Sequence, residues 1–123
     1  ANTMIDMAKT EIAPAISAYA LELANTAAAK KTVDVTISCS YETGLLKKLA
    51  RLEDQIAVRA DELKTAVMKL QDASDIEAES YMIRDEILGR MSELRIACDE
   101  AETITAKKYW PFTTYSDLLF GVK

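Results

Sequence analysis

The side chains in this sequence that could do chemistry are first of all its carboxylates. Acidic residues recur at helical spacing along 77–102, namely Glu77, Glu79, Glu86, Glu93, Glu100 and Glu102. Oxygen ligands arranged in this way could bind a divalent metal ion. They alternate with Arg84, Arg90 and Arg95, and a face carrying both signs of charge is typical of a solvated, salt-bridged helix. We therefore favour the solvated face over a metal site.

Histidine is absent from the chain. This absence excludes Ser–His and Cys–His nucleophile pairs, histidine-ligated zinc and a Glu-x-x-His di-iron bundle. The isolated glycines Gly44 and Gly89 form no phosphate-binding loop. Cys39 and Cys98 have no CxxC spacing and no base partner, so we interpret them as reduced thiols of a cytoplasmic protein. We predict no catalytic, cofactor-binding or metal-binding residue in this chain.

Three further residues lie inside predicted helices where their types are unusual. Arg59 and Arg90 interrupt rows of apolar residues. Each could bind an anion, but an arginine at such a position more often marks the edge of a packed seam, and we favour that interpretation. Gly89 is predicted to mark a bend or a close contact between helices.

Length and charge restrict the class of protein. The chain has 123 residues and a net charge of −5, which is typical of one acidic domain with a real core. It has no long basic run, so we expect neither a nucleic-acid nor a membrane partner. No apolar run is long enough to span a bilayer, and no secretory signal is visible. Because the sequence opens at Ala1, we interpret it as a piece of a longer protein.

Apolar residues recurring every three or four positions predict an all-α fold with three long helices, over about 3–31, 41–71 and 75–108. The first is expected to bend at Pro14. Ser40 is predicted to cap the second helix. Ser74 and Glu77 form a capping box that starts the third. The short break favours an antiparallel hairpin of the second and third helices, with a single long helix as the alternative.

The segment 32–40 has a different pattern. Val33, Val35, Ile37 and Cys39 alternate with polar residues, which is the period of a strand. One strand is not stable alone. We expect an extended crossover laid along the bundle with these residues facing inward, or else a short edge strand paired with the C-terminal tail.

The tail, residues 109–123, is strongly aromatic. It holds five of the chain's eight aromatic residues. Pro111 ends the third helix, so the tail is predicted to be extended. It either packs on its own helices or docks on another domain or subunit, since Trp and Tyr are favoured at interfaces. The predicted docking residues are Trp110, Pro111, Phe112, Tyr115, Asp117, Leu118, Leu119 and Phe120.

The run from Trp110 to Phe120 closely resembles the C-terminal signature of type III glutamine synthetases, a pattern close to W-P-[FY]-P-x-Y-x-D-L-L-F. Thr113 and Ser116 depart from it, where proline and glycine are frequent. Further residues match the family's penultimate helix and the helix that enters this domain, which bends at a proline. These are Arg84-Asp85, Met91, Leu94-Arg95, Asp99-Glu100, Met4 to Ala8 and Ile12 to Ala15.

The resemblance implies a role as part of a larger enzyme. Type III glutamine synthetases join ammonia to glutamate with ATP and magnesium or manganese, and they assemble as dodecamers. The family's catalytic residues belong to upstream regions, so ATP and metal are expected only there. The implied partners of this piece are the catalytic domain of the same chain and neighbouring subunits. The alternative is a free-standing helical adaptor or coiled-coil module.

Overall fold

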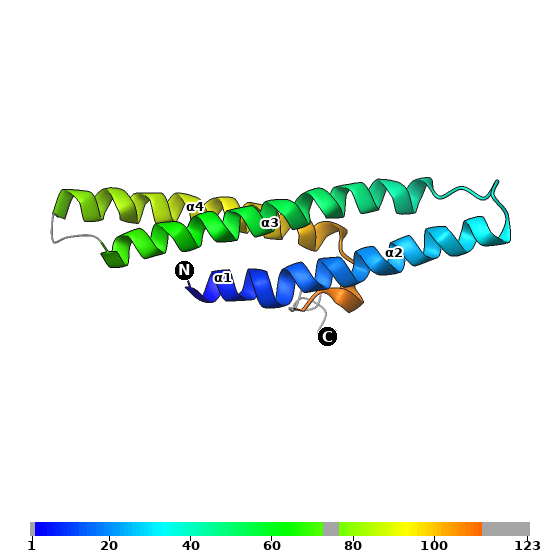
Figure 1. The fold of residues 1–123 in the computed structure, drawn as a ribbon, viewed down its shortest axis with the longest axis horizontal. Helices are drawn as coiled ribbons and strands as arrows, with labels where there is room; N and C mark the ends of the chain where they lie inside the picture. Colours follow the sequence, from blue (N-terminus) through cyan, green and yellow to red (C-terminus); the bar gives the residue numbers. More distant parts are fainter. Residues whose placement is uncertain (1, 73–76, 112–123) are drawn as a thin grey trace, which may run out of the picture.

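The computed structural model describes residues 2–72 and 77–111, with side chains for all of these except 77–80. It is an elongated array of helices (Figure 1). The elements are α1 (Asn2–Met7), the π-helical turn η1 (Ala8–Ile12), α2 (Ala13–Val33), α3 (Ser40–Asp72), α4 (Glu77–Ile104) and the 3₁₀ turn η2 (Lys107–Tyr109). The predictions of an all-helical chain and of three helices are confirmed, because α1, η1 and α2 follow one another without a break. The described residues contain no strand.

The first helix carries its irregularity just before the proline. Pro14 has no backbone N–H, and its ring would clash with the carbonyl of the preceding turn. The backbone N–H of Ala13 bonds to the carbonyl of Ala8, five residues back. One widened π turn thus accommodates the proline inside an otherwise continuous helix.

The connection from α2 to α3 is a tight turn, so the predicted extended crossover is wrong. Val33 and Val35 are 79% and 76% exposed, and only Ile37 and Cys39 are partly buried. Asp34 organises the turn, since its Oδ1 accepts from the Thr36 N–H at 2.8 Å and the Thr36 hydroxyl at 2.7 Å. Such an Asx turn satisfies the backbone locally, so no strand partner is needed.

α3 begins one residue earlier than predicted. The carbonyl of Cys39 accepts the Thr43 N–H at 2.9 Å, so Cys39 occupies the cap position that was predicted for Ser40. α3 then contacts every other long helix of the chain, and in Figure 1 it runs between α4 and the α1–α2 helix.

The core follows the predicted stripes. It joins residues of α1, η1 and α2 to α3 and α4, and each fully buried Leu or Ile contributes about 1.5–3 kcal/mol. Its larger members are Ile5, Ile12, Ile16, Tyr19, Leu23, Leu49, Leu52, Ile56, Leu63 and Leu94.

α3 and α4 form an antiparallel hairpin (Figure 1), so the alternative of one long helix is wrong. The sequence predicts that Ile83, Ile87, Leu94 and Ala97 face α3, and these residues differ in burial. Leu94 and Ala97 are buried, whereas Ile83 and Ile87 are only half-buried. The predicted capping residue Ser74 lies outside the described residues.

Gly89 marks neither a bend nor a close contact, contrary to prediction. It lies within α4, and a Cβ built on it would meet no atom within 4 Å. The position is exposed, so a side chain would have room there.

Candidate docking site

The chain leaves α4 at Ile104, four residues before the predicted end at 108. The last helical-type bond joins the Thr105 N–H to the Ala101 carbonyl at 2.9 Å. Thr103, Ile104 and Thr105 are β-branched, which lowers helix propensity. Ala106 then turns to an extended conformation with ψ 136°, and η2 follows. The chain therefore reverses towards α2 before the tail begins.

η2 is anchored on α2. The ring of Tyr109 lies 5.5 Å from that of Tyr19, with a tilt of 34°. Lys108 Nζ lies 2.8 Å from Oε1 of Glu22, and this hydrogen bond is the main reason that the pKa of the Glu22 carboxyl lies below its usual value. An aromatic contact and an ion pair thus hold the start of the tail against the first helix.

Trp110 continues from this anchor into a groove between α1–η1 and α4. The groove has a volume of about 430 Å³. We call it the α1–α4 groove and define its apolar wall as Met4, Met7, Ile12, Met91, Cys98 and Trp110. Thr3, Arg95, Asp99 and Glu102 form its polar rim. Trp110 is half-buried and packs against the main core, while Pro111 is exposed.

The wall is rich in methionine. Three of the chain's five methionines line it. Methionine side chains are flexible and polarisable, and they are frequent on surfaces that adapt to an apolar partner. The groove is thus suited to binding an apolar segment.

Only part of the predicted docking tail can be placed. Trp110 lines the groove, and Pro111 follows it at an exposed position. The other predicted residues, Phe112, Tyr115, Asp117, Leu118, Leu119 and Phe120, lie outside the described residues. Their docking role stays a prediction.

Arg59 and Arg90 lie at the edge of the packed seam between α3 and α4, which is the interpretation favoured from the sequence. Arg59 Nη1 lies 2.9 Å from Glu62 and 3.3 Å from Glu93. Arg90 also pairs with Glu62, and with Glu93 at 3.2 Å. The four side chains bridge α3 and α4. Sequence analysis missed this network, although an Arg-x-x-Glu spacing in both helices signals it, since i and i+3 lie on one face.

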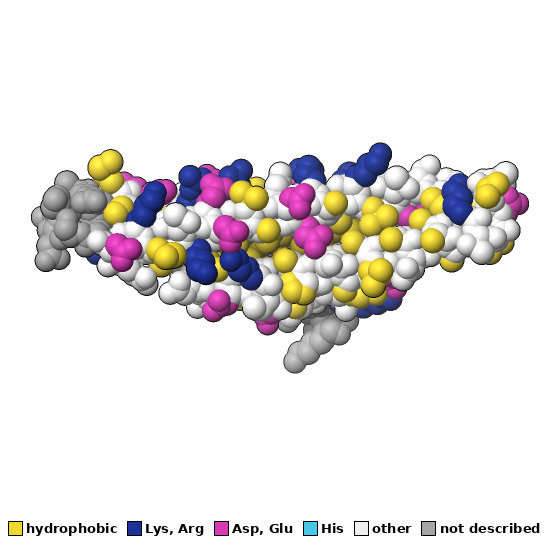
Figure 2. Space-filling view, viewed as in Figure 1, with side chains coloured by type: hydrophobic (Ala, Val, Ile, Leu, Met, Phe, Trp, Pro, Cys, Tyr) yellow, Lys and Arg dark blue, Asp and Glu magenta, His cyan; other side chains and the backbone are white. Residues whose placement is uncertain are grey.

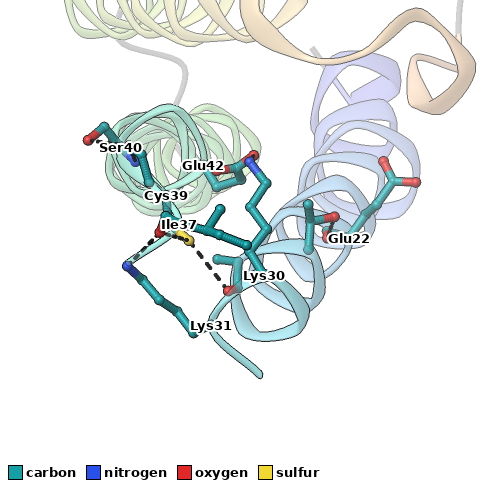
Figure 3. A network of polar contacts seen from close by, with 10 residues as sticks. Glu22, Lys30, Lys31, Ile37, Cys39, Ser40 and Glu42 are labelled. Atoms are coloured by element: carbon teal, nitrogen blue, oxygen red, sulfur yellow. Dashed lines mark hydrogen bonds and ion pairs between the residues drawn. The ribbon is translucent and has the colours of Figure 1, made fainter. Parts of the chain in front are cut away.

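A second polar network lies at the turn between α2 and α3 (Figure 3). Lys30 Nζ lies 2.7 Å from Oε2 of Glu42, whose side chain is only 7% exposed. This hydrogen bond is the main reason that the pKa of Glu42 lies below its usual value. Lys31 donates to the carbonyls of Val35 and Ile37 at 2.9 and 2.7 Å. These contacts stabilise the turn, and the charged groups are paired with other groups of the same network.

Among the described residues, the groups that could do chemistry are the carboxylates and the cysteine thiols. No three acidic or cysteine side chains among them converge on one point where a metal could bind. Burial raises the pKa of the Cys98 thiol to about 11, so at neutral pH it is a thiol and a poor nucleophile. On the face drawn in Figure 2 the two signs of charge are interspersed, with apolar side chains along the middle. Within residues 2–72 and 77–111, no helix is long and apolar enough for a membrane span.

Comparison with known proteins points to one class of enzyme. No protein-family model matches the chain, and no solved structure matches it significantly. A curated protein matches the chain over 122 residues with 28% identity. It is a glutamine synthetase of Butyrivibrio fibrisolvens, and the match covers 98% of this chain but only 17% of that protein. The similarity is consistent with this chain corresponding to a fragment of a glutamine synthetase.

Proposed function

We propose that this chain is a non-catalytic, helical C-terminal domain of a type III glutamine synthetase, with a structural role in the assembled enzyme. The observation that carries the proposal is the similarity to a glutamine synthetase along the whole of this chain. The signature from Trp110 to Phe120 supports the assignment to type III and to the C-terminal end.

A structural role agrees with how the charged groups are used. Several charged residues at the described surface form ion pairs, including the network of Arg59, Glu62, Arg90 and Glu93. An active site needs perturbed titratable groups that converge in a cleft. The α1–α4 groove has an apolar wall, and the pKa of its Cys98 thiol is raised to about 11, which keeps the thiol protonated and a poor nucleophile at neutral pH.

The proposed partners follow from this role. The domain would contact the catalytic part of its own chain and neighbouring subunits of a dodecamer in the cytoplasm. Its contact segment would be the aromatic run from Trp110 to Phe120. The reaction would be ATP-dependent ligation of ammonia to glutamate, with ATP and magnesium or manganese bound in the catalytic part.

Two measurements on two proteins test this proposal: calorimetry for ATP binding and an activity assay for glutamine formation. The complete protein that contains this chain is expected to bind ATP with magnesium and to form glutamine from glutamate and ammonia. The 123-residue chain alone is expected to do neither. Saturable nucleotide binding by the chain alone would contradict the non-catalytic role. A complete protein without any glutamine synthetase activity would instead favour the helical adaptor.

A further inference from the structure

The α1–α4 groove is the side of the bundle where helix packing is incomplete. α3 packs along both α4 and the α1–α2 helix. Near Met4 and Met91 the half-buried side chains of α1 and α4 line a hollow, and no third helix of the described chain closes it. An apolar hollow of this kind is a site for an apolar segment.

The chain itself arrives at one end of this groove. Trp110 is part of the wall, and η2 fixes its position through the contacts of Lys108 and Tyr109 with α2. Pro111 follows at the surface. Residues 112–123 therefore start within a residue or two of the groove.

The composition of residues 112–123 suits the groove, and about five of these twelve residues are enough to cover its length. Five of the residues are large and apolar or aromatic, namely Phe112, Tyr115, Leu118, Leu119 and Phe120. From Glu102 to Met91 the groove extends about 16 Å along α4, at about 1.5 Å per residue. An extended chain covers about 3.3 Å per residue, so roughly five residues span this distance.

We propose that a part of residues 112–123 occupies the α1–α4 groove of their own chain when the domain is free. The tether favours the intramolecular arrangement, because a short connection gives an effective concentration of about millimolar or more. A second copy would have to compete with it from solution. In the assembled enzyme, neighbours would compete for the same segment. The proposal rests on the proposed function only in treating this segment as a docking element.

The five methionines provide reporters for a direct test. Met4, Met7 and Met91 line the groove, whereas Met68 and Met82 line a separate hollow near the α3–α4 connection. A nitroxide label is placed on a Ser116→Cys variant of the full chain in which Cys39 and Cys98 are replaced by Ser. Methyl NMR spectra of ¹³C-methyl-methionine protein are recorded with the label oxidised and reduced.

The expected result is stronger paramagnetic broadening of the Met4, Met7 and Met91 methyls than of the Met68 and Met82 methyls, unchanged on tenfold dilution. A matched protein with Leu118, Leu119 and Phe120 also replaced by Ser is expected to lose this difference. Equal signals for all five methyls, or the strongest broadening at Met68 and Met82, would overturn the proposal. If the broadening arises between a nitroxide-labelled molecule and a separate ¹³C-labelled molecule, the groove is occupied by a second copy. That result would also overturn the proposal. None of these results depends on glutamine synthetase activity, so the two proposals can fail separately.

Discussion

At the scale of single residues, Glu42 shows how burial and charge are combined. Its carboxylate lies at the start of α3 against Lys30, and its Oε1 is buried without a hydrogen-bond partner among the protein atoms. The ion pair and the positive end of the helix dipole both favour the charged form. The energetic role of Glu42 should therefore depend on pH.

We expect Glu42→Gln to lower the melting temperature at pH 7. The pKa of Glu42 is lowered in the fold from its ordinary value of 4.5, so its stabilising effect is present above that pH and is lost as pH falls through the lower folded value. The difference between the two proteins should thus shrink below about pH 4.5. Thermal unfolding followed by circular dichroism from pH 7 to 3 measures it.

The matched control for this prediction is Glu11→Gln. Glu11 lies on η1 and is exposed, so its replacement should change the melting temperature little at any pH. If the melting temperature of Glu42→Gln is lower by the same amount at every pH, the shape of the Glu42 side chain, and not its charge, gives it its role.

At the scale of elements, the long helices were predictable, whereas the turn between α2 and α3 was not. Apolar residues repeat over many turns in 2–33, 40–72 and 77–104, and each repeat reinforces the same face. The turn at 34–39 is short, and the residue pattern around it suggests a different structure. Its alternating Val33 and Val35 suggest a strand, but Asp34 and Lys31 satisfy the turn backbone locally.

The candidate site was predictable only in part. The aromatic tail could be identified from composition, and Trp110 does lie against the bundle. The groove could not, because its wall combines α1, η1 and α4 with a residue beyond η2. That combination depends on the end of α4 at Ile104 and the reversal at Ala106, which the helical period of the apolar residues does not mark.

The interior of α4 offers a stabilising substitution. Gly89→Ala should raise the free energy of unfolding by about 0.5–1 kcal/mol, because alanine restricts the unfolded chain and favours helix. The open space around Gly89 leaves no clash to offset this gain. Urea denaturation checks the prediction, and a loss of stability would reveal that the glycine is needed for a contact.

The α3–α4 seam should respond unevenly to truncation. Leu94 is fully buried, so Leu94→Ala should cost about 2–5 kcal/mol. Ile87 is half-buried, so Ile87→Ala should cost less, below about 2 kcal/mol. Chemical denaturation of both variants compares them directly. Equal losses at the two positions would mean that the hairpin packs differently near Ile87.

At the scale of the whole molecule, the chain combines a paired, charged surface with one adaptable apolar groove and an aromatic tail. Among the described residues, no three acidic or cysteine side chains converge as metal ligands. The similarity of the chain extends to only 17% of a glutamine synthetase. These features suit a domain that supports contacts between larger parts.

The most direct test of this structural role is sedimentation velocity of the complete protein that contains this chain. It is compared with the same protein in which Trp110, Phe112 and Tyr115 are replaced by Ala. We predict that the native protein sediments as a large assembly and that the variant shifts to smaller species, because its aromatic contact area is removed. Identical sedimentation profiles for the two proteins, with unchanged thermal stability, would contradict the claim that this domain holds the assembly together.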